Sequence, residues 1–203
     1  MGADHRLCVK ITLEDPEGKI LPFLEALSEW QKYPQNEDYP PELAEHPAMS
    51  FLNRIERPHH FVKQIHSSAG TEHWQFYQFV RETPTRASLS FGSDGKIYTP
   101  CVEAYFEMVE PYLVAQNNQL LALFADDDGD CVLPTVFRDG KPVWAEFNFN
   151  EGDEIRKDFG LVWPLYDYVE CLGDPDDHWL DFEKTLIKWT LAGKKPPVSH
   201  HRF

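Results

Sequence analysis

Three Asp-Gly dipeptides, at positions 94–95, 128–129 and 139–140, each lie between two short segments of strand-like sequence. Asp-Gly favours the two-residue turns of β-hairpins, because both turn positions need positive φ. Hairpin-linked strands are antiparallel, and a sheet built from them leaves few places for the long crossovers that parallel strands require. The pattern therefore predicts an α+β protein with a mainly antiparallel sheet, several hairpins and three to five packed helices.

The strands expected on either side of these turns differ in character. The segment 6–13 alternates apolar and polar residues, which is typical of a strand with one buried face. The segment 120–125 is an unbroken apolar run, which predicts a central strand buried on both faces. The aromatic-rich segment 72–80 is also expected to pack on both faces. Further strands are predicted at 87–91, 96–99, 131–137 and 143–149, and Pro134 makes its strand an edge strand or a bulged one.

Apolar residues at helical spacing predict the helices. One stripe runs from Ile20 to Trp30 and ends before Pro34, and a second runs from Val102 to Leu113 with a kink at Pro111. Thr99 and Pro100 suit the N-cap and first position of that second helix. The segment 49–66 is ambiguous and fits two short helices split by Pro58. The last quarter is predicted to be helical, with its longest helix reaching Ala192.

The chain has 203 residues, of which 42% are hydrophobic. This is enough for a core without disulfides or bound metals. Since there is no repeat and no convincing linker, a single domain over 1–203 is predicted. The Pro- and Glu-rich segment 33–47 is expected to be a surface loop and 194–203 an exposed tail. The four cysteines form no C-x-x-C pair, and the N-terminus lacks a signal peptide's apolar run. These features favour a cytoplasmic protein with reduced thiols.

The charge balance is strongly acidic. Asp and Glu number 34 against 19 Lys and Arg, which gives a formal net charge of −15. Nucleic-acid backbones and anionic membrane surfaces repel such a chain unless a basic patch intervenes, and the sequence contains no such patch. Direct binding to nucleic acid or membrane is therefore not expected.

The motifs that mark the main enzyme classes are missing. There is no phosphate-binding loop, no dinucleotide-binding glycine turn, no H-E-x-x-H and no G-x-S-x-G. This argues against P-loop enzymes and Rossmann dehydrogenases, but only weakly against hydrolases whose carboxylates come from distant segments. The His59–His73 histidines match no zinc-ligand spacing, and an EF-hand register over Phe124–Thr135 lacks its terminal carboxylates. No cofactor and no catalytic or metal-binding residue is assigned.

Three functions stay open after these exclusions. The first is an acidic binding protein, such as an inhibitor or immunity-type protein that neutralises a basic toxic enzyme or a nucleic-acid-binding enzyme; a DNA mimic has the same charge pattern. The second is a motif-poor hydrolase that uses carboxylates or a metal. The third is a small-ligand-binding domain with a pocket lined by Trp74, Phe76, Tyr77 and Phe79. The charge and the lack of catalytic motifs favour the first.

The partner-binding surface expected for that function combines two acidic segments with an aromatic anchor. Carboxylates crowd the 126–130 turn and recur after the following strand, and Trp144 with Phe137 are candidates for the apolar contact that charge alone does not provide. The predicted partner-binding residues are Asp126, Asp127, Asp128, Asp130, Trp144, Glu151, Asp153 and Glu154.

Overall fold

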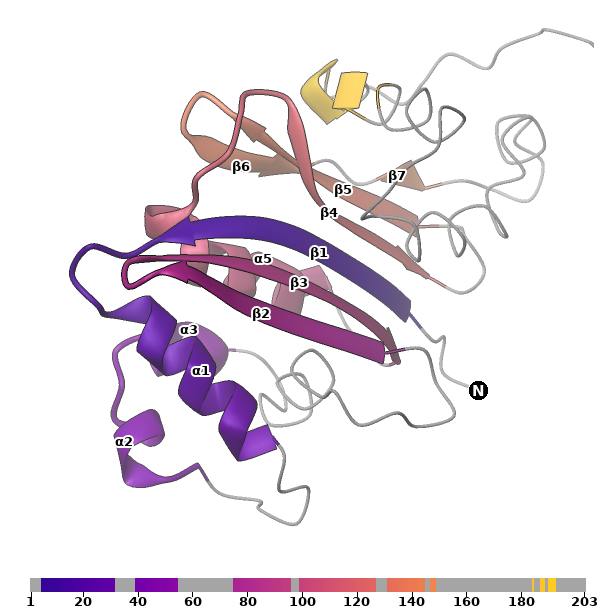
Figure 1. Cartoon of the computed structure of the whole chain (residues 1–203). Coiled ribbons are helices and arrows are strands. Elements are labelled where there is room, and N and C mark those ends of the chain that lie inside the picture. Colours follow the sequence, from indigo (N-terminus) through magenta and orange to yellow (C-terminus); the bar gives the residue numbers. More distant parts are fainter. Residues whose placement is uncertain are drawn as a thin grey trace, which may run out of the picture. The chain divides into compact units, whose positions relative to one another are not determined.

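The structure is a computed structural model of the whole chain. It describes residues 5–31, 39–54, 75–95, 99–126, 131–144 and 147–148, and the helical residues 184, 187–188 and 190–192. The chain divides into two compact units, one of residues 9–115 and one of residues 1–8 with 116–203. Each unit combines strands with helical residues, and every strand pair whose register is described is antiparallel, so the fold class is α+β (Figure 1). The single domain predicted from the sequence stays a prediction.

The unit of residues 9–115 contains strands β1 (His5–Glu14, whose first residues belong to the other unit), β2 (Gln75–Thr83) and β3 (Arg86–Gly95). They are arranged in the order β2-β3-β1. The predicted alternation in β1 is confirmed from Val9 onward, since the odd-numbered residues from Leu7 to Leu13 are buried while Lys10 and Glu14 are exposed; Cys8, on the face expected to be polar, is buried as well. One face of β1 therefore contributes to the core.

Two helices cover one face of β2 and β3. Helix α1 (Ile20–Gln31) reaches β2 through Arg81 and Glu25, and helix α5 (Thr99–Val109) reaches β3 through the edge-on contact of Phe91 with Tyr105, 5.5 Å between ring centroids. Register places Tyr77 opposite Phe91 and Arg81 opposite Ala87, so these contacts share one face of the sheet. The predicted helical stripes are buried: Ile20, Phe23, Leu24, Leu27, Trp30, Val102, Tyr105, Phe106 and Val109. At Pro111 the α-helix gives way to a 3₁₀ turn, η1 (Glu110–Tyr112), because proline cannot donate the next helical hydrogen bond.

Two predictions about β2 and β3 are wrong. The segment Ser93-Asp94-Gly95 is not a turn, because β3 continues through it and Ser93 pairs with Gln75; the hairpin turn is at Pro84-Thr85. In addition, β2 is not packed on both faces over its described side chains, since Gln78 is exposed and Val80 has 44% of its surface exposed. The long antiparallel pairing with β2 outweighs the local turn preference of Asp-Gly.

The expected loop 33–47 contains a short helix, α2 (Pro41–Ala44), whose Leu43 is buried. A second short helix, α3 (Met49–Leu52), begins the segment that was ambiguous in sequence. His46 connects the two helices, and its ring stacks on Phe23 of α1 with centroids 4.4 Å apart. The segments 32–38 and 55–74 lie outside the described residues.

The second unit contains an antiparallel sheet of β4 (Gln119–Asp126), β5 (Cys131–Arg138), β6 (Lys141–Trp144) and β7 (Phe147–Asn148). The predicted buried strand is confirmed, because Leu120 to Phe124 are each at most 4% exposed. The β5–β6 hairpin turns at Asp139-Gly140 as predicted, with φ of 51° and 86°. These are the positive values that a type I′ turn needs.

Pro134 does not mark an edge strand. Its strand β5 pairs with β4 on one side and with β6 and β7 on the other. On that second side, the described pairing with β6 ends at Thr135 and the pairing with β7 begins at Val132. Pro134 lies between these two ladders, where its lack of an N–H group costs no described strand hydrogen bond. The expected bulge is not in β5 either: the register shift adds a residue to β4, between Leu120 and Ala122, and Pro134 itself pairs with Leu123. Among residues 149–203 only six helical positions are described, Lys184, Ile187, Lys188, Thr190, Leu191 and Ala192, and the exposed tail predicted for 194–203 lies outside them.

Candidate partner-binding surface

The β4–β5 hairpin places the first acidic segment at one end of its sheet. Ala125 pairs with Val132, so the chain leaves β4 at Asp126 and returns at Cys131. The turn residues Asp127, Asp128 and Asp130 lie between these points and outside the described residues, and the side chain of Asp126 is likewise not described. The hairpin predicted around Asp128-Gly129 is confirmed by the pairing of its two strands.

Strand β7 brings the chain back to the same end of the sheet. Phe147 pairs with Val132 and Asn148 with Cys131, so β7 runs antiparallel to β5 and points toward the acidic turn. Glu151, Asp153 and Glu154 follow Asn148 by three to six residues and lie outside the described residues. Since a residue spans at most about 3.6 Å, covalent geometry alone keeps the Cα of Glu151 within about 11 Å of that of Asn148. The register therefore brings Asn148, which precedes the second acidic segment, to the sheet end at which β4 leaves for the first, although β5, β6 and β7 separate the two segments in sequence.

Of the two aromatic side chains expected to contact a partner, only one is partly exposed to solvent. Trp144 lies opposite Thr135 on β6 and is partly exposed. Phe137 lies two residues along β5 and so shares that face of the sheet. It is only 8% exposed and belongs to the core. Phe137 is therefore not an accessible anchor, and of the two aromatics Trp144 alone stays a candidate contact.

At the opposite end of this sheet, near the β5–β6 turn, two asparagines bind the residues of the turn, and there is no cluster of carboxylates among the described residues. Nη1 of Arg138 donates to Oδ1 of Asn118 at 2.7 Å, and the backbone N–H of Asp139 donates to Oδ1 of Asn117 at 3.0 Å. Asn118 has a φ of 67°. Asn accepts this left-handed conformation more readily than most residues. These hydrogen bonds join the segment before β4 to the β5–β6 turn.

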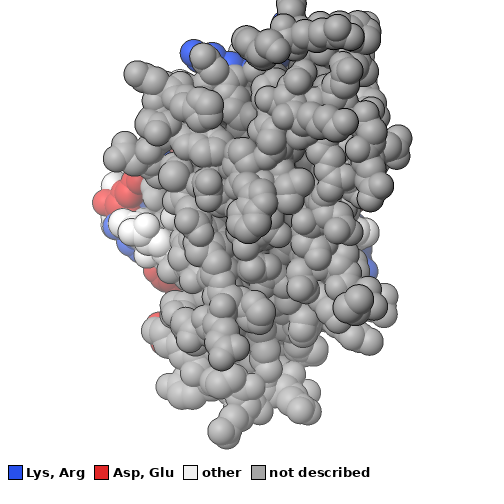
Figure 2. All heavy atoms as spheres, turned by 90° about the vertical axis from the view of Figure 1, so that its right-hand side faces the viewer, with Lys and Arg blue, Asp and Glu red and all other residues white. Residues whose placement is uncertain are grey.

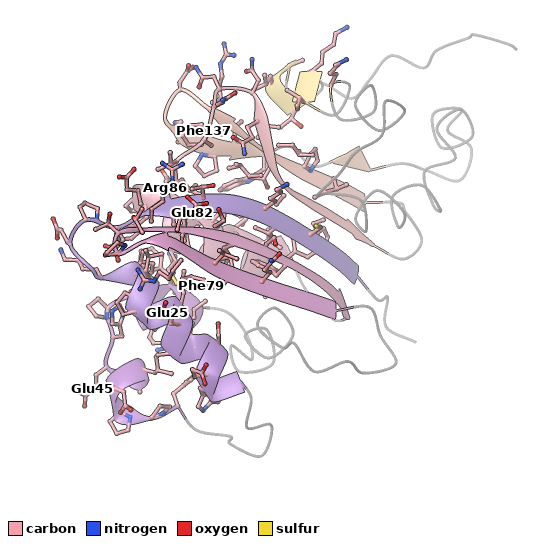
Figure 3. The ribbon with its side chains drawn as sticks, viewed as in Figure 1. Glu25, Glu45, Phe79, Glu82, Arg86 and Phe137 are labelled. Atoms are coloured by element: carbon pink, nitrogen blue, oxygen red, sulfur yellow. The ribbon has the colours of Figure 1, made fainter. Side chains whose placement is uncertain are left out.

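Several cations of the described chain are bound to its own carboxylates. Arg81 donates from Nε and Nη2 to the two oxygens of Glu25, at 2.7 and 3.0 Å, and Nε of Arg86 donates to Glu82 at 3.0 Å. Figure 3 shows Glu25 beneath Phe79 and Glu82 beside Arg86. Further ion pairs join Arg54 to Glu107, Lys19 to Glu17 and Arg138 to Asp139. On the face drawn in Figure 2, red and blue side chains lie next to each other at the left margin.

These pairings shift the ionisation of the groups involved. The hydrogen bonds from Arg81 lower the pKa of Glu25, and the same contact raises the pKa of Arg81. Because about two fifths of the Glu25 side chain is exposed, water screens the pair and its contribution to stability is small. The main consequence is local neutrality, since Arg81 has no free charge to offer an anionic ligand.

Asp15, directly after β1, is a buried carboxylate. Its side chain is 0% exposed, and its Oδ2 accepts the backbone N–H groups of Ile20 and Leu21 at 2.8 and 3.0 Å. Burial raises the pKa of this carboxyl, but the hydrogen bonds from the backbone of Leu21, Lys19, Ile20 and Gly18 outweigh it and hold the pKa below its usual value. Its backbone N–H also donates to Thr85, which connects the start of α1 to the β2–β3 turn. Its role is structural.

Neither alternative function gains a site from the described residues. Within this part of the chain no group of three His, Cys, Asp or Glu side chains could hold a metal ion, and the histidines from His59 to His73 lie outside it. Of the aromatics proposed to line a pocket, only the Phe79 side chain is described, and the guanidinium of Arg81 lies over its ring at 5.8 Å. No helix in the described ranges is long and apolar enough to cross a membrane.

Comparison with known proteins does not connect the chain to a family. No protein-family description, no curated protein and no solved structure matches it. Function is therefore inferred from the charge and geometry of the chain itself.

Proposed function

We propose that this protein is an acidic binding protein that neutralises a basic protein partner, in the manner of an inhibitor or immunity protein. The proposed binding surface, called the acidic end below, consists of two carboxylate segments and one aromatic side chain. Its residues are Asp126, Asp127, Asp128, Asp130, Trp144, Glu151, Asp153 and Glu154.

The pairing of β7 with β5 carries this proposal. It brings the chain that leads into Glu151 to the same sheet end as the turn after Asp126, a proximity that the sequence alone could not establish. The two segments contain seven carboxylates, and paired antiparallel strands hold the points from which both segments depart. The proposal requires that these carboxylates form a concentrated negative field at that sheet end. Such a field accelerates encounter with a positively charged surface by electrostatic steering.

The charge of the rest of the chain also favours a positively charged partner. The net charge is −15, and the described ion pairs use Arg54, Arg81, Arg86 and Arg138 internally. A basic protein, such as a toxic enzyme or an enzyme that binds nucleic acid, has the complementary charge. An inhibitor of this kind needs no catalytic group of its own, in keeping with its proposed place in the cytoplasm beside its target.

Differential affinity capture tests the proposal. Wild-type protein, the acidic-end variant Asp127→Lys/Asp128→Lys and the control variant Glu42→Lys/Glu45→Lys are used as baits in extract of the native cell. Glu42 and Glu45 are exposed on and beside α2, so the control makes the same change in net charge at another place. We expect a stoichiometric basic protein with the wild type and the control but not with the acidic-end variant. Equal capture by all three baits, or no basic partner at all, would contradict the proposal.

A further inference from the structure

Strand β2 lies at an edge of its sheet. Among the described strands its one hydrogen-bonded neighbour is β3, so the other side of β2 presents backbone N–H and C=O groups without a strand partner in the described chain. Such an edge is a template for another strand, and natural proteins usually guard it with Lys, Pro, a bulge or a short strand.

The first six residues of β2 lack those guards. Their sequence is Gln-Phe-Tyr-Gln-Phe-Val, with no charge, no Pro and no Gly. The register irregularity of the hairpin comes only after them, between Arg81 and Thr83. Uncharged, β-prone segments of about six residues are those that pair most readily with identical copies of themselves.

The described side chains on the outward face of this stretch are exposed. Gln78 is exposed, and Val80 is the exposed large hydrophobic residue of the described chain. Phe79 points to the opposite face, where it lies under Arg81 on the side of α1. A strand added at this edge would therefore meet Val80 without disturbing the packing of the helix.

Charge favours this edge as the place where two copies meet. Two chains of net charge −15 repel each other, and the repulsion is least where local charges are already paired. Beside the uncharged stretch, Arg81 is bound to Glu25 and Arg86 to Glu82. The β2 edge thus combines backbone groups that have no strand partner in the described chain with nearby charges that are already paired.

We propose that residues Phe76–Val80 of β2 pair antiparallel with the same residues of a second copy of this chain, about a two-fold axis. A register centred on Gln78 places Val80 opposite Phe76 of the second copy and keeps both exposed valines on one face of a continuous sheet. A five-residue strand pair buries less than the roughly 1,200 Å² typical of stable complexes, so the dimer is weak and concentration-dependent.

Sedimentation velocity over low micromolar to near-millimolar concentrations tests this dimer at low and moderate salt. The wild type is expected to dimerise as concentration rises, and more strongly with salt, which screens the repulsion. Val80→Lys should raise the dimer Kd by about tenfold or more, because it places a lysine on each paired edge, opposite Phe76 of the second copy. The control Ala44→Lys, at an exposed position of α2, should dimerise as the wild type does.

Hydrogen exchange provides a second measurement that follows the backbone directly. Amides in Phe76–Val80 should exchange more slowly at high concentration in the wild type and not in Val80→Lys. If Val80→Lys does not fold, Gln78→Lys replaces it at the other exposed position of the strand. A wild type that stays monomeric throughout, or a dimer that both lysine variants retain unchanged, would overturn the proposal; neither result depends on the partner of the acidic end.

Discussion

Replacing Asp15 with Ala should reveal how strongly one buried carboxylate fixes the start of α1. The substitution removes the acceptor of two backbone N–H groups, those of Ile20 and Leu21, at a site with no solvent exposure. Loss of an N-terminal cap costs about 1 kcal/mol, and leaving a buried donor unsatisfied costs about 1–3 kcal/mol. Removing a desolvated charge returns part of this cost. We expect the free energy of unfolding to fall by about 2–4 kcal/mol.

The pH dependence of that difference identifies its cause. The folded-state pKa of Asp15 is lowered relative to the unfolded chain. Its contribution is therefore fully present above the unfolded pKa, about 3.9, and is lost as pH falls through the lower folded-state pKa. Urea unfolding of wild type and Asp15→Ala at neutral pH and at several more acidic values should show a difference that shrinks with acid. A loss below about 1 kcal/mol, or one that is the same at every pH, would refute this reasoning.

Three further predictions concern other parts of the structure. Leu123→Ala, in the buried strand β4, should lower the free energy of unfolding by about 2–5 kcal/mol in urea titration, whereas a cost typical of surface positions would contradict its burial. Gly140→Ala should cost about 1 kcal/mol or slightly more in the same titration, because an L side chain disfavours positive φ. Crowding is not the cause, since no atom lies within 4 Å of the added Cβ, and a neutral substitution would argue against the type I′ turn. Thiol titration after denaturation without reductant should count four free groups, one for each cysteine of the sequence; a count of two or none would contradict the reduced state.

The sequence predicted those elements whose pattern is local and strong. The apolar residues of β1, the stripe from Ile20 to Trp30 and the apolar run of β4 are buried as their spacing predicts. Helix α5 begins at Thr99, next to the Pro100 that predicted its start. Asp139-Gly140 also behaved as predicted, because both of its φ values are positive in the tight turn that the dipeptide favours.

The failures arise where pairing over long distance decides the result. Asp94-Gly95 has the same turn preference as Asp139-Gly140, yet β3 continues through it because the partner strand β2 extends to Gln75. The position of Pro134 between two ladders depends on where β6 ends and β7 begins, which no local signal specifies.

For the candidate binding surface, the sequence predicted which residues take part but not how the chain brings their segments to one end of the sheet. The sequence identified the carboxylates but not the return of the chain to the same sheet end, which depends on the pairing of Asn148 with Cys131. The Arg81–Glu25 pair joins residues 56 positions apart, and the capping role of Asp15 acts from five residues before the helix, outside the usual N-cap position. Neither had a recognisable signal in the sequence.

The association rate constant of the acidic end with its captured partner, measured across salt concentrations, tests the central claim most directly. Reversing Asp127 and Asp128 to Lys should slow association markedly and flatten its salt dependence, with a smaller effect on dissociation. The Glu42→Lys/Glu45→Lys control should retain most of the wild-type rate, because its charge change is not at the binding surface. Equal association rates for the wild type and the acidic-end variant, or equal slowing in both variants, would contradict a partner-binding role for the acidic end.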